Sequence, residues 1–258
     1  MFTRLREWRH RRIVERHGID VDLWSRVIAE HRLFDDFDSA QLRGLHDLAA
    51  LFLHEKRVFG THALEITDFM RVTVAAQAVV PILNLDLSYY RGWTVILLYP
   101  GAFIARHEFA DEAGVVHVIE EELDGEAMDA GSVVISWEQA SAGPQRFPGT
   151  NVVIHELAHK LDYLNGDANG LPPLHGDMSV NAWARAFGEA YAHMIAQLER
   201  NAPLRLDSYA AESPAEFFAV MSEAFFETPG DLVDTYPEVY RELAAFYRQN
   251  PLRPAHNF

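Results

Sequence analysis

The sequence contains no cysteine and no long hydrophobic run. Without cysteine the chain can form no disulfide framework, no thiolate metal site and no cysteine nucleophile, and it suits a reducing compartment. Its most apolar stretch, Val72–Leu85, includes Gln77 and Pro81 and is shorter than the ~20 residues that span a bilayer. The basic N-terminus is not followed by the apolar segment of a signal peptide. We therefore expect a cytoplasmic protein without membrane contact, in which this stretch forms a buried core helix that ends near Pro81.

Basic side chains are also scarce. The chain has 22 lysines and arginines against 38 acidic residues, which gives a formal net charge of −16. Because binding to phosphate groups requires a basic surface, this charge argues against direct recognition of nucleic acid. The exception is residues 1–16, where arginines surround Leu5, Trp8 and Ile13. The helical spacing of these three apolar residues predicts a helix whose basic face is solvated.

The order of apolar patterns predicts an α+β fold. Residues 1–55 have helical periodicity, with a helix start at Asp38-Ser39, and another helix is expected at 66–81. Residues rich in β-branched and aromatic side chains then predict strands at 93–98, 115–119 and 133–137. Four further helices are expected at Asn151–Leu164, Asn181–Glu199, Pro214–Glu227 and Asp231–Arg248. The prediction is thus N-terminal helices, a small mixed sheet, and C-terminal helices.

A His-Glu-x-x-His motif lies within the first of these later helices. Thr150 is the expected N-cap, and Asn165-Gly166 supplies the helix end. His155 and His159 are four residues apart and share one helix face, where both imidazoles can bind a single ion. Glu156 is rotated about a third of a turn away, so its carboxylate can reach a water on the metal rather than the metal itself. The motif therefore predicts two zinc ligands and a general base.

A catalytic zinc ion needs a third protein ligand and an open position. An extended motif with histidine at 165 and glycine at 162 is excluded, because those positions hold Asn165 and Asp162. The best candidate is Glu216, which follows Ser213 as N-cap and Pro214 as first helical residue. The residues alone are equally compatible with a zinc ligand and with a side chain that closes a capping box with Ser213. Other carboxylates that compete for the ligand position are Glu212, Glu223 and Asp177.

Two segments, HELAHKLD at 155–162 and SYAAESPAEFFAVMSEAFF at 208–226, carry a family resemblance. Together they resemble the bacterial Mlc titration factor A family of zinc peptidases, a likeness that extends over most of the chain and includes VVISW at 133–137. After about residue 150 the chain also resembles, more distantly, the catalytic domain of anthrax lethal factor. In both, a tyrosine seven residues before a glutamate precedes a Phe-Phe-Ala run, as Tyr209 and Glu216 do here.

The resemblance implies that one zinc ion per chain is bound by His155, His159 and Glu216, and that Glu156 and Tyr209 are catalytic. It implies a zincin-like metallopeptidase core of gluzincin type. We expect residues 1–258 to form one such domain, with an N-terminal helical subregion at 1–60 and a catalytic core at 130–248. The expected chemistry is peptide-bond hydrolysis by a zinc-activated water. Glu156 would act as general base and the Tyr209 hydroxyl as a donor to the oxyanion.

Two further residue roles are open at this point. Asp162, three residues after His159, is expected either to orient a ligand imidazole or to face solvent. The strand at Val133–Trp137 is expected either to be an edge along which a peptide substrate lies, or to be an internal strand. The motifs also leave open whether cleavage starts from a chain end, as in an aminopeptidase, or occurs internally.

A second function from a different class follows from the family name. That name records binding to the transcriptional repressor Mlc, so the resemblance implies Mlc as a partner and a part in regulating the glucose phosphotransferase system. The alternative function is a repressor-binding protein whose zinc site is structural or vestigial. Glu156 and Tyr209 favour the peptidase, because a purely structural metal site has no use for a general base.

Overall fold

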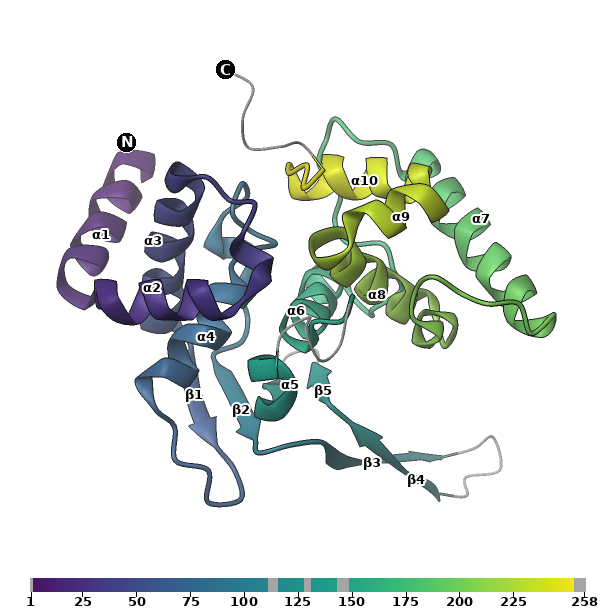
Figure 1. The fold of residues 1–258 in the computed structure, drawn as a ribbon, viewed down its shortest axis with the longest axis horizontal. Helices are drawn as coiled ribbons and strands as arrows, with labels where there is room; N and C mark the ends of the chain where they lie inside the picture. The colour runs from purple at the N-terminus through teal and green to yellow at the C-terminus, as the bar shows by residue number, and fades with distance from the viewer. Residues whose placement is uncertain (1, 111–115, 128–130, 143–148, 253–258) are drawn as a thin grey trace.

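The computed structural model describes residues 2–110, 116–127, 131–142 and 149–252 (Figure 1). Its helices are α1 (Phe2–His17), α2 (Val21–Glu30), α3 (Ser39–Glu55), α4 (Asp68–Ala78), α5 (Trp137–Ala142), α6 (Val152–Asp162), α7 (Val180–Glu199), α8 (Pro214–Glu227), α9 (Pro229–Thr235) and α10 (Pro237–Tyr247). Its strands are β1 (Arg57–Gly60), β2 (Val95–Tyr99), β3 (Phe103–Ala110), β4 (Val116–Leu123), β5 (Gly125–Ala127) and β6 (Val133–Ser136). The predicted α+β order of helices, strands and helices is confirmed.

A mixed sheet with the strand order β1-β2-β6-β5 packs against α6, and its strands β1, β2 and β5 lie below the helices in Figure 1. β1, β2 and β6 are parallel, and β5 pairs antiparallel with β6 at one edge. β3 and β4 form a separate antiparallel hairpin that extends away from the helices in Figure 1. The prediction that Val133–Trp137 is an edge strand is wrong, because β6 lies between β2 and β5 and Trp137 begins α5. The edge near the motif helix is β5.

Helix α6 lies at the centre of this arrangement. It contacts β5 and β6 of the sheet, α4 from the N-terminal half and α8 from the C-terminal half. Its apolar side chains Ile154, Leu157 and Leu161 are fully buried, as their spacing of three and four residues predicts. The hydrophobic effect thus fixes which face of α6 turns inward, and the histidine face follows from that orientation.

Helix α4 accounts for the most apolar stretch of the sequence. It begins after the N-cap Thr67 and ends at Ala78, and Val72, Val74 and Ala75 are buried. The expected core helix is confirmed, with its end three residues before Pro81. Within the described part of the chain, no helix combines the length and the hydropathy needed to cross a bilayer.

Two of the differences between the predicted and observed helices have a clear physical cause. Helix α6 starts one residue later than expected, because Asn151 rather than Thr150 is the N-cap, and its side chain accepts a hydrogen bond from the Ile154 N–H at 3.0 Å. The single helix expected at Asp231–Arg248 is wrong, since the structure has α9 and α10 there. Pro237 has no N–H to continue the first helix, and it disfavours helical geometry at the preceding residue. Tyr236 accordingly has φ −134° and separates the two helices.

Gly170 lies in the loop after α6, where both its backbone conformation and its close packing require glycine. Its φ is +77°, and a Cβ there would lie 2.4 Å from the carbonyl oxygen of Pro214. Its N–H also donates to Asp162 Oδ2 at 2.7 Å. We therefore expect Gly170→Ala to lower the free energy of unfolding by about 2 kcal/mol or more, measured by chemical denaturation. Gly176→Ala is the matched control, because nothing lies within 4 Å of that position. Equal stability of the two variants would contradict this account.

Candidate metal centre

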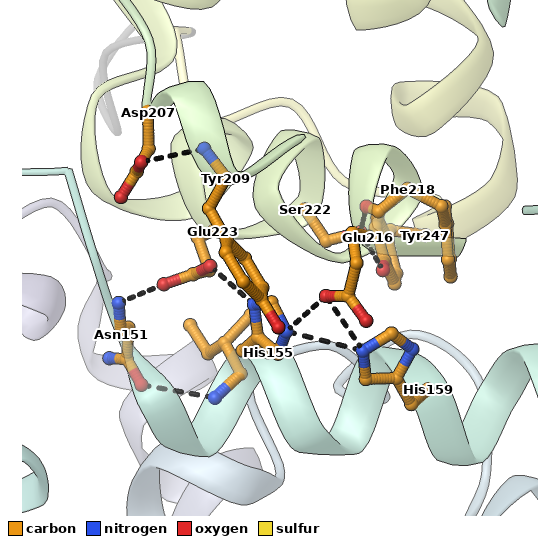
Figure 2. Close-up of polar contacts among 11 residues, drawn as sticks. Asn151, His155, His159, Asp207, Tyr209, Glu216, Phe218, Ser222, Glu223 and Tyr247 are labelled. Carbon is orange, nitrogen blue, oxygen red and sulfur yellow. Dashed lines mark hydrogen bonds and ion pairs between the residues drawn. The ribbon is translucent and has the colours of Figure 1, made fainter. Parts of the chain in front are cut away.

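The two motif histidines point from α6 toward α8. His155 and His159 are one helical turn apart, and their ring centroids are 4.8 Å apart. Both side chains are largely buried. Their Nε2 atoms are only 3.2 Å apart, so the two lone pairs converge on the same point in space (Figure 2). The two imidazoles therefore lie together on one face of α6, as their four-residue spacing predicts.

Glu216 reaches the same point from the first turn of α8. Ser213 is the N-cap of this helix and accepts a hydrogen bond from the Glu216 N–H at 3.1 Å. The Glu216 carboxylate is directed to the imidazoles instead, with Oε2 3.0 Å from His155 Nε2 and 3.3 Å from His159 Nε2. The helix cap therefore uses the Glu216 backbone, and its side chain is left for the histidines (Figure 2). A cap and a ligand role are compatible here.

These three residues fit a zinc ion. Their ligand atoms all lie within 4.8 Å of one another, and the three closest approaches are 3.0, 3.2 and 3.3 Å. Tetrahedral ligand atoms held ~2.0–2.1 Å from one ion are roughly 3.3 Å apart. Two imidazoles and one carboxylate also form a donor set used by catalytic zinc sites. The spacing and chemistry of the three side chains thus suit a catalytic rather than a closed structural site.

Glu223 is the residue whose function the sequence did not reveal. The sequence makes it a competing candidate for the ligand position, yet its Oε1 lies 2.7 Å from His155 Nδ1, on the side of the ring away from Glu216. Its Oε2 accepts a hydrogen bond from the Asn151 N–H at the start of α6. Glu223 lies two turns after Glu216 on one face of α8, and that spacing was the available signal. It orients the imidazole so that Nε2 faces Glu216 and His159.

Asp162 makes no hydrogen bond to His159 in the structure. Its Oδ2 accepts the Gly170 N–H, and burial raises the pKa of this carboxyl. Neither Asp162 Oδ1 nor His159 Nδ1 has a hydrogen-bond partner among the described residues. Asp162 is fully buried, so the alternative of a solvent-facing acid is wrong. Its observed role is to hold the loop after α6.

The electrostatics of the cluster favour a cation between the imidazoles and the carboxylates. Burial disfavours a charged His155, but Glu223, Glu216 and Glu156 outweigh burial and raise its pKa well above the ordinary value. Burial likewise disfavours a charged Glu216, yet its contacts with the two histidines lower its pKa far below the ordinary range. The carboxylates thus favour a positive charge beside the imidazoles, and a metal ion held by neutral imidazoles would supply that charge in place of the proton on His155.

Glu156 is set apart from the three potential ligands. It is only 4% exposed, and its Oε2 has no hydrogen-bond partner within the described parts of the chain. Burial raises its pKa to about 7. Its Oε1 faces the backbone of Gly125 in β5. The carboxylate therefore lies between the edge strand and the motif helix, and it is available to accept a proton.

Tyr209 lies beside the histidine pair, close to the ring of His155. It belongs to a 3-10 helix, Ser208–Ala211, that begins where its N–H donates to Asp207 Oδ1 at 2.9 Å. Its ring centroid is 6.0 Å from that of His155, toward which the ring points in Figure 2. The side chain is 36% exposed. Tyr209 thus borders the centre and remains accessible from solvent.

A cleft of about 950 Å³ opens over these residues. Its lining residues come from the edge strand β5, from α6, from the 3-10 helix and from α8. Besides His155, Glu156, His159, Tyr209, Glu216 and Glu223, its lining includes Asp124, Gly125, Glu126, Gln139, Tyr163, Asp207 and Glu212. All five predicted site residues therefore line one cleft.

Comparison with known proteins agrees with this geometry. Residues 5–248 match the family described as glucose-regulated metallo-peptidase M90. The chain belongs to this metallopeptidase family. It is 32% identical over 249 residues to an uncharacterised protein of Synechocystis sp., across 95% of this chain and 90% of that protein.

Several relatives carry a more specific name. The chain is 36% identical over 210 residues to Mlc titration factor A of Pectobacterium atrosepticum, across 80% of this chain and 78% of the relative. It is 33% identical over 211 residues to the protein of the same name from Yersinia enterocolitica, across 81% and 78%. The resemblance to the Mlc titration factor A family is thereby confirmed, while that to lethal factor stays a prediction.

Substitution of Glu223 tests the orienting contact. Glu223→Gln keeps the side-chain shape but removes the charge that holds His155, so we expect zinc affinity to fall about 10- to 100-fold. A competition titration against a chelating dye measures this affinity. Glu227→Gln is the matched control, because Glu227 lies one turn further along α8 and contacts the Asn151 side chain instead of a histidine. A loss of affinity in the control as large as in Glu223→Gln would contradict the assigned role.

Proposed function

We propose that this protein is a zinc-dependent peptidase of gluzincin type, built as one zincin-like domain over residues 1–258. One observation carries the proposal. Three potential ligand atoms converge in the lining of a cleft beside Glu156, a buried carboxylate that is not among them. His155, His159 and Glu216 would hold the ion. A closed structural metal site requires neither a cleft nor a separate carboxylate.

The chemistry divides between the ion and the side chains. When bound, zinc supplies a Lewis acid that lowers the pKa of water and polarises a carbonyl group. Glu156 would take the proton of the water that attacks the scissile carbonyl, and would then return it to the leaving amine. Its position next to His155 but outside the ligand cluster, with Oε2 unpaired among described residues, supports this role. Glu223 keeps His155 oriented throughout.

Tyr209 and β5 border the two sides of the substrate path that we propose. The Tyr209 hydroxyl would donate a hydrogen bond to the oxyanion that forms at the scissile carbonyl. β5 is the edge of the sheet on the cleft side, so its outer backbone groups can pair with an extended peptide. Main-chain pairing accepts many side chains, which suits a peptidase of broad sequence preference.

The charge of the cleft supports an aminopeptidase. Beyond the residues of the centre, its lining includes Asp124, Glu126, Asp207 and Glu212. None of the described residues that line it is lysine or arginine. Carboxylates within a few ångströms attract an ammonium group by roughly 1 kcal/mol or more each. A peptide with a free N-terminal ammonium group is therefore the substrate class that we propose.

We propose the repressor Mlc as a protein partner, because relatives that match most of this chain are named Mlc titration factor A. Regulation of a transcriptional repressor takes place in the cytoplasm, and we propose that location. In the alternative function, repressor binding with a structural zinc site, the buried Glu156 carboxylate has no chemical role. Peptide hydrolysis and repressor binding are thus proposed as separate activities of one chain.

Replacement of Glu156 separates these two activities. We expect Glu156→Gln to reduce peptide turnover by about 100-fold or more, because the amide cannot accept the proton. Zinc content and Mlc binding should be retained, as measured by metal analysis and by a pull-down with purified repressor. Glu189→Gln, on the exposed face of α7, is the control for charge removal. Undiminished hydrolysis by zinc-loaded Glu156→Gln would refute the peptidase mechanism.

Blocking the substrate amine tests the aminopeptidase proposal. We expect a peptide with a free N-terminus to be cleaved at least about 10-fold faster than its N-acetylated form, measured as kcat/KM, since acetylation removes the cation. Raising the salt concentration should narrow the difference. Equal cleavage of both forms would indicate an endopeptidase and leave the role of Glu156 intact.

A further inference from the structure

Strand β5 approaches the motif helix unusually closely at one residue. A Cβ added to Gly125 would lie 2.3 Å from Glu156 Oε1 and 2.8 Å from both Cδ and Cγ of the same side chain. Non-bonded carbon atoms reach their optimal separation at about 3.5–4.0 Å. No side chain other than hydrogen therefore fits at position 125 while the Glu156 carboxylate keeps its place.

The need for glycine here comes from space and not from backbone conformation. The described glycines with positive φ are Gly92, Gly149, Gly166 and Gly170, and Gly125 is not among them. An alanine could adopt the backbone angles of position 125 without strain. What it would meet is one side chain, that of Glu156, and none of the three closest atoms belongs to the backbone.

The backbone on either side of this contact has little freedom to retreat. Gly125 pairs with Ile135 of β6, and the Ser136 N–H donates to the Asp124 carbonyl at 2.7 Å. On the other side, α6 is anchored by its fully buried Leu157 and by the bond from the Asn151 N–H to Glu223. The flexible part of the contact is the Glu156 side chain itself. A side chain at position 125 would thus be accommodated by displacement of the Glu156 carboxylate.

We propose that Gly125 is a positioning residue for the reaction, because its missing side chain creates the space in which the Glu156 carboxylate is held. The inference rests on the proposed function and deepens it. The bare backbone of β5 forms one wall of this space, and the helix turn that carries His155 and His159 forms the other. The edge strand proposed to bind the peptide thereby also sets the position of the proposed base beside it.

The test compares Gly125→Ala with Gly188→Ala, a matched glycine with nothing within 4 Å. We expect Gly125→Ala to fold and to bind zinc with an affinity close to that of the wild type. Its kcat should fall about 100-fold, the lower end of what a general base supplies, with KM little changed. Gly188→Ala should match the wild type in all three measurements. Wild-type kcat in Gly125→Ala, or a loss of zinc affinity as large as the loss of kcat, would overturn the proposal.

A thermal double-mutant cycle supplies a readout that does not depend on turnover. Gly125→Ala should lower the melting temperature of the wild type. It should have no such effect in the Glu156→Ala background, where the three closest atoms are absent. An equal decrease in both backgrounds would overturn the proposal. If wild-type protein hydrolyses no peptide, the proposed function fails, and this thermal coupling alone then decides whether Gly125 positions Glu156.

Discussion

The contact between α6 and α8 is the constraint on which the rest of the site depends. It brings together His155 and Glu216, which are 61 residues apart in the chain, and it places a carboxylate on each nitrogen of one imidazole. Glu216 lies 3.0 Å from His155 Nε2, and Glu223 lies 2.7 Å from Nδ1. A shift of α8 by one residue would move both carboxylates about 1.5 Å along the helix axis and turn them by roughly 100° around it. Both contacts with the imidazole would then be broken.

The same contact concentrates negative charge in a buried place. Glu156 and Glu223 are 4% and 5% exposed, and the cluster also includes Glu216. A buried carboxylate costs several kcal/mol unless a cation or hydrogen bonds compensate it. Glu216 and Glu223 are compensated by the histidines, and a metal ion among the ligand atoms would compensate them further. Binding of a metal ion at this place would therefore be linked to folding, since an ion that binds only the folded state stabilises it.

The local parts of the site could be predicted from the sequence. His155, Glu156 and His159 follow from the spacing within one helix, and the helices at both ends follow from apolar periodicity. Glu216 required the family resemblance, because its helix-start pattern also suits a capping box. Glu223 lies too far from the motif in sequence for local periodicity to show which imidazole it would meet.

The edge of the sheet was beyond prediction for a different reason. β5 has three residues, Gly125–Ala127, too few for a period of two to appear. VVISW has the composition of a buried strand, and that composition alone does not say whether the strand lies at the edge. The importance of Gly125 is a property of the packing between a strand and a helix, and no pattern in the sequence expresses it. Register and close approach thus appear only in three dimensions.

The state of Glu156 bears on the choice between a peptidase and a repressor-binding protein. For a protein that only binds a partner, a buried carboxylate without a hydrogen bond on Oε2 lowers stability and contributes nothing to a surface. Glutamine or an apolar residue at this position would remove the cost of the charge. Here the chain instead leaves room for the carboxylate at Gly125, next to two histidines and inside a cleft. The proposed proton transfer would use this arrangement, whereas repressor binding alone would not.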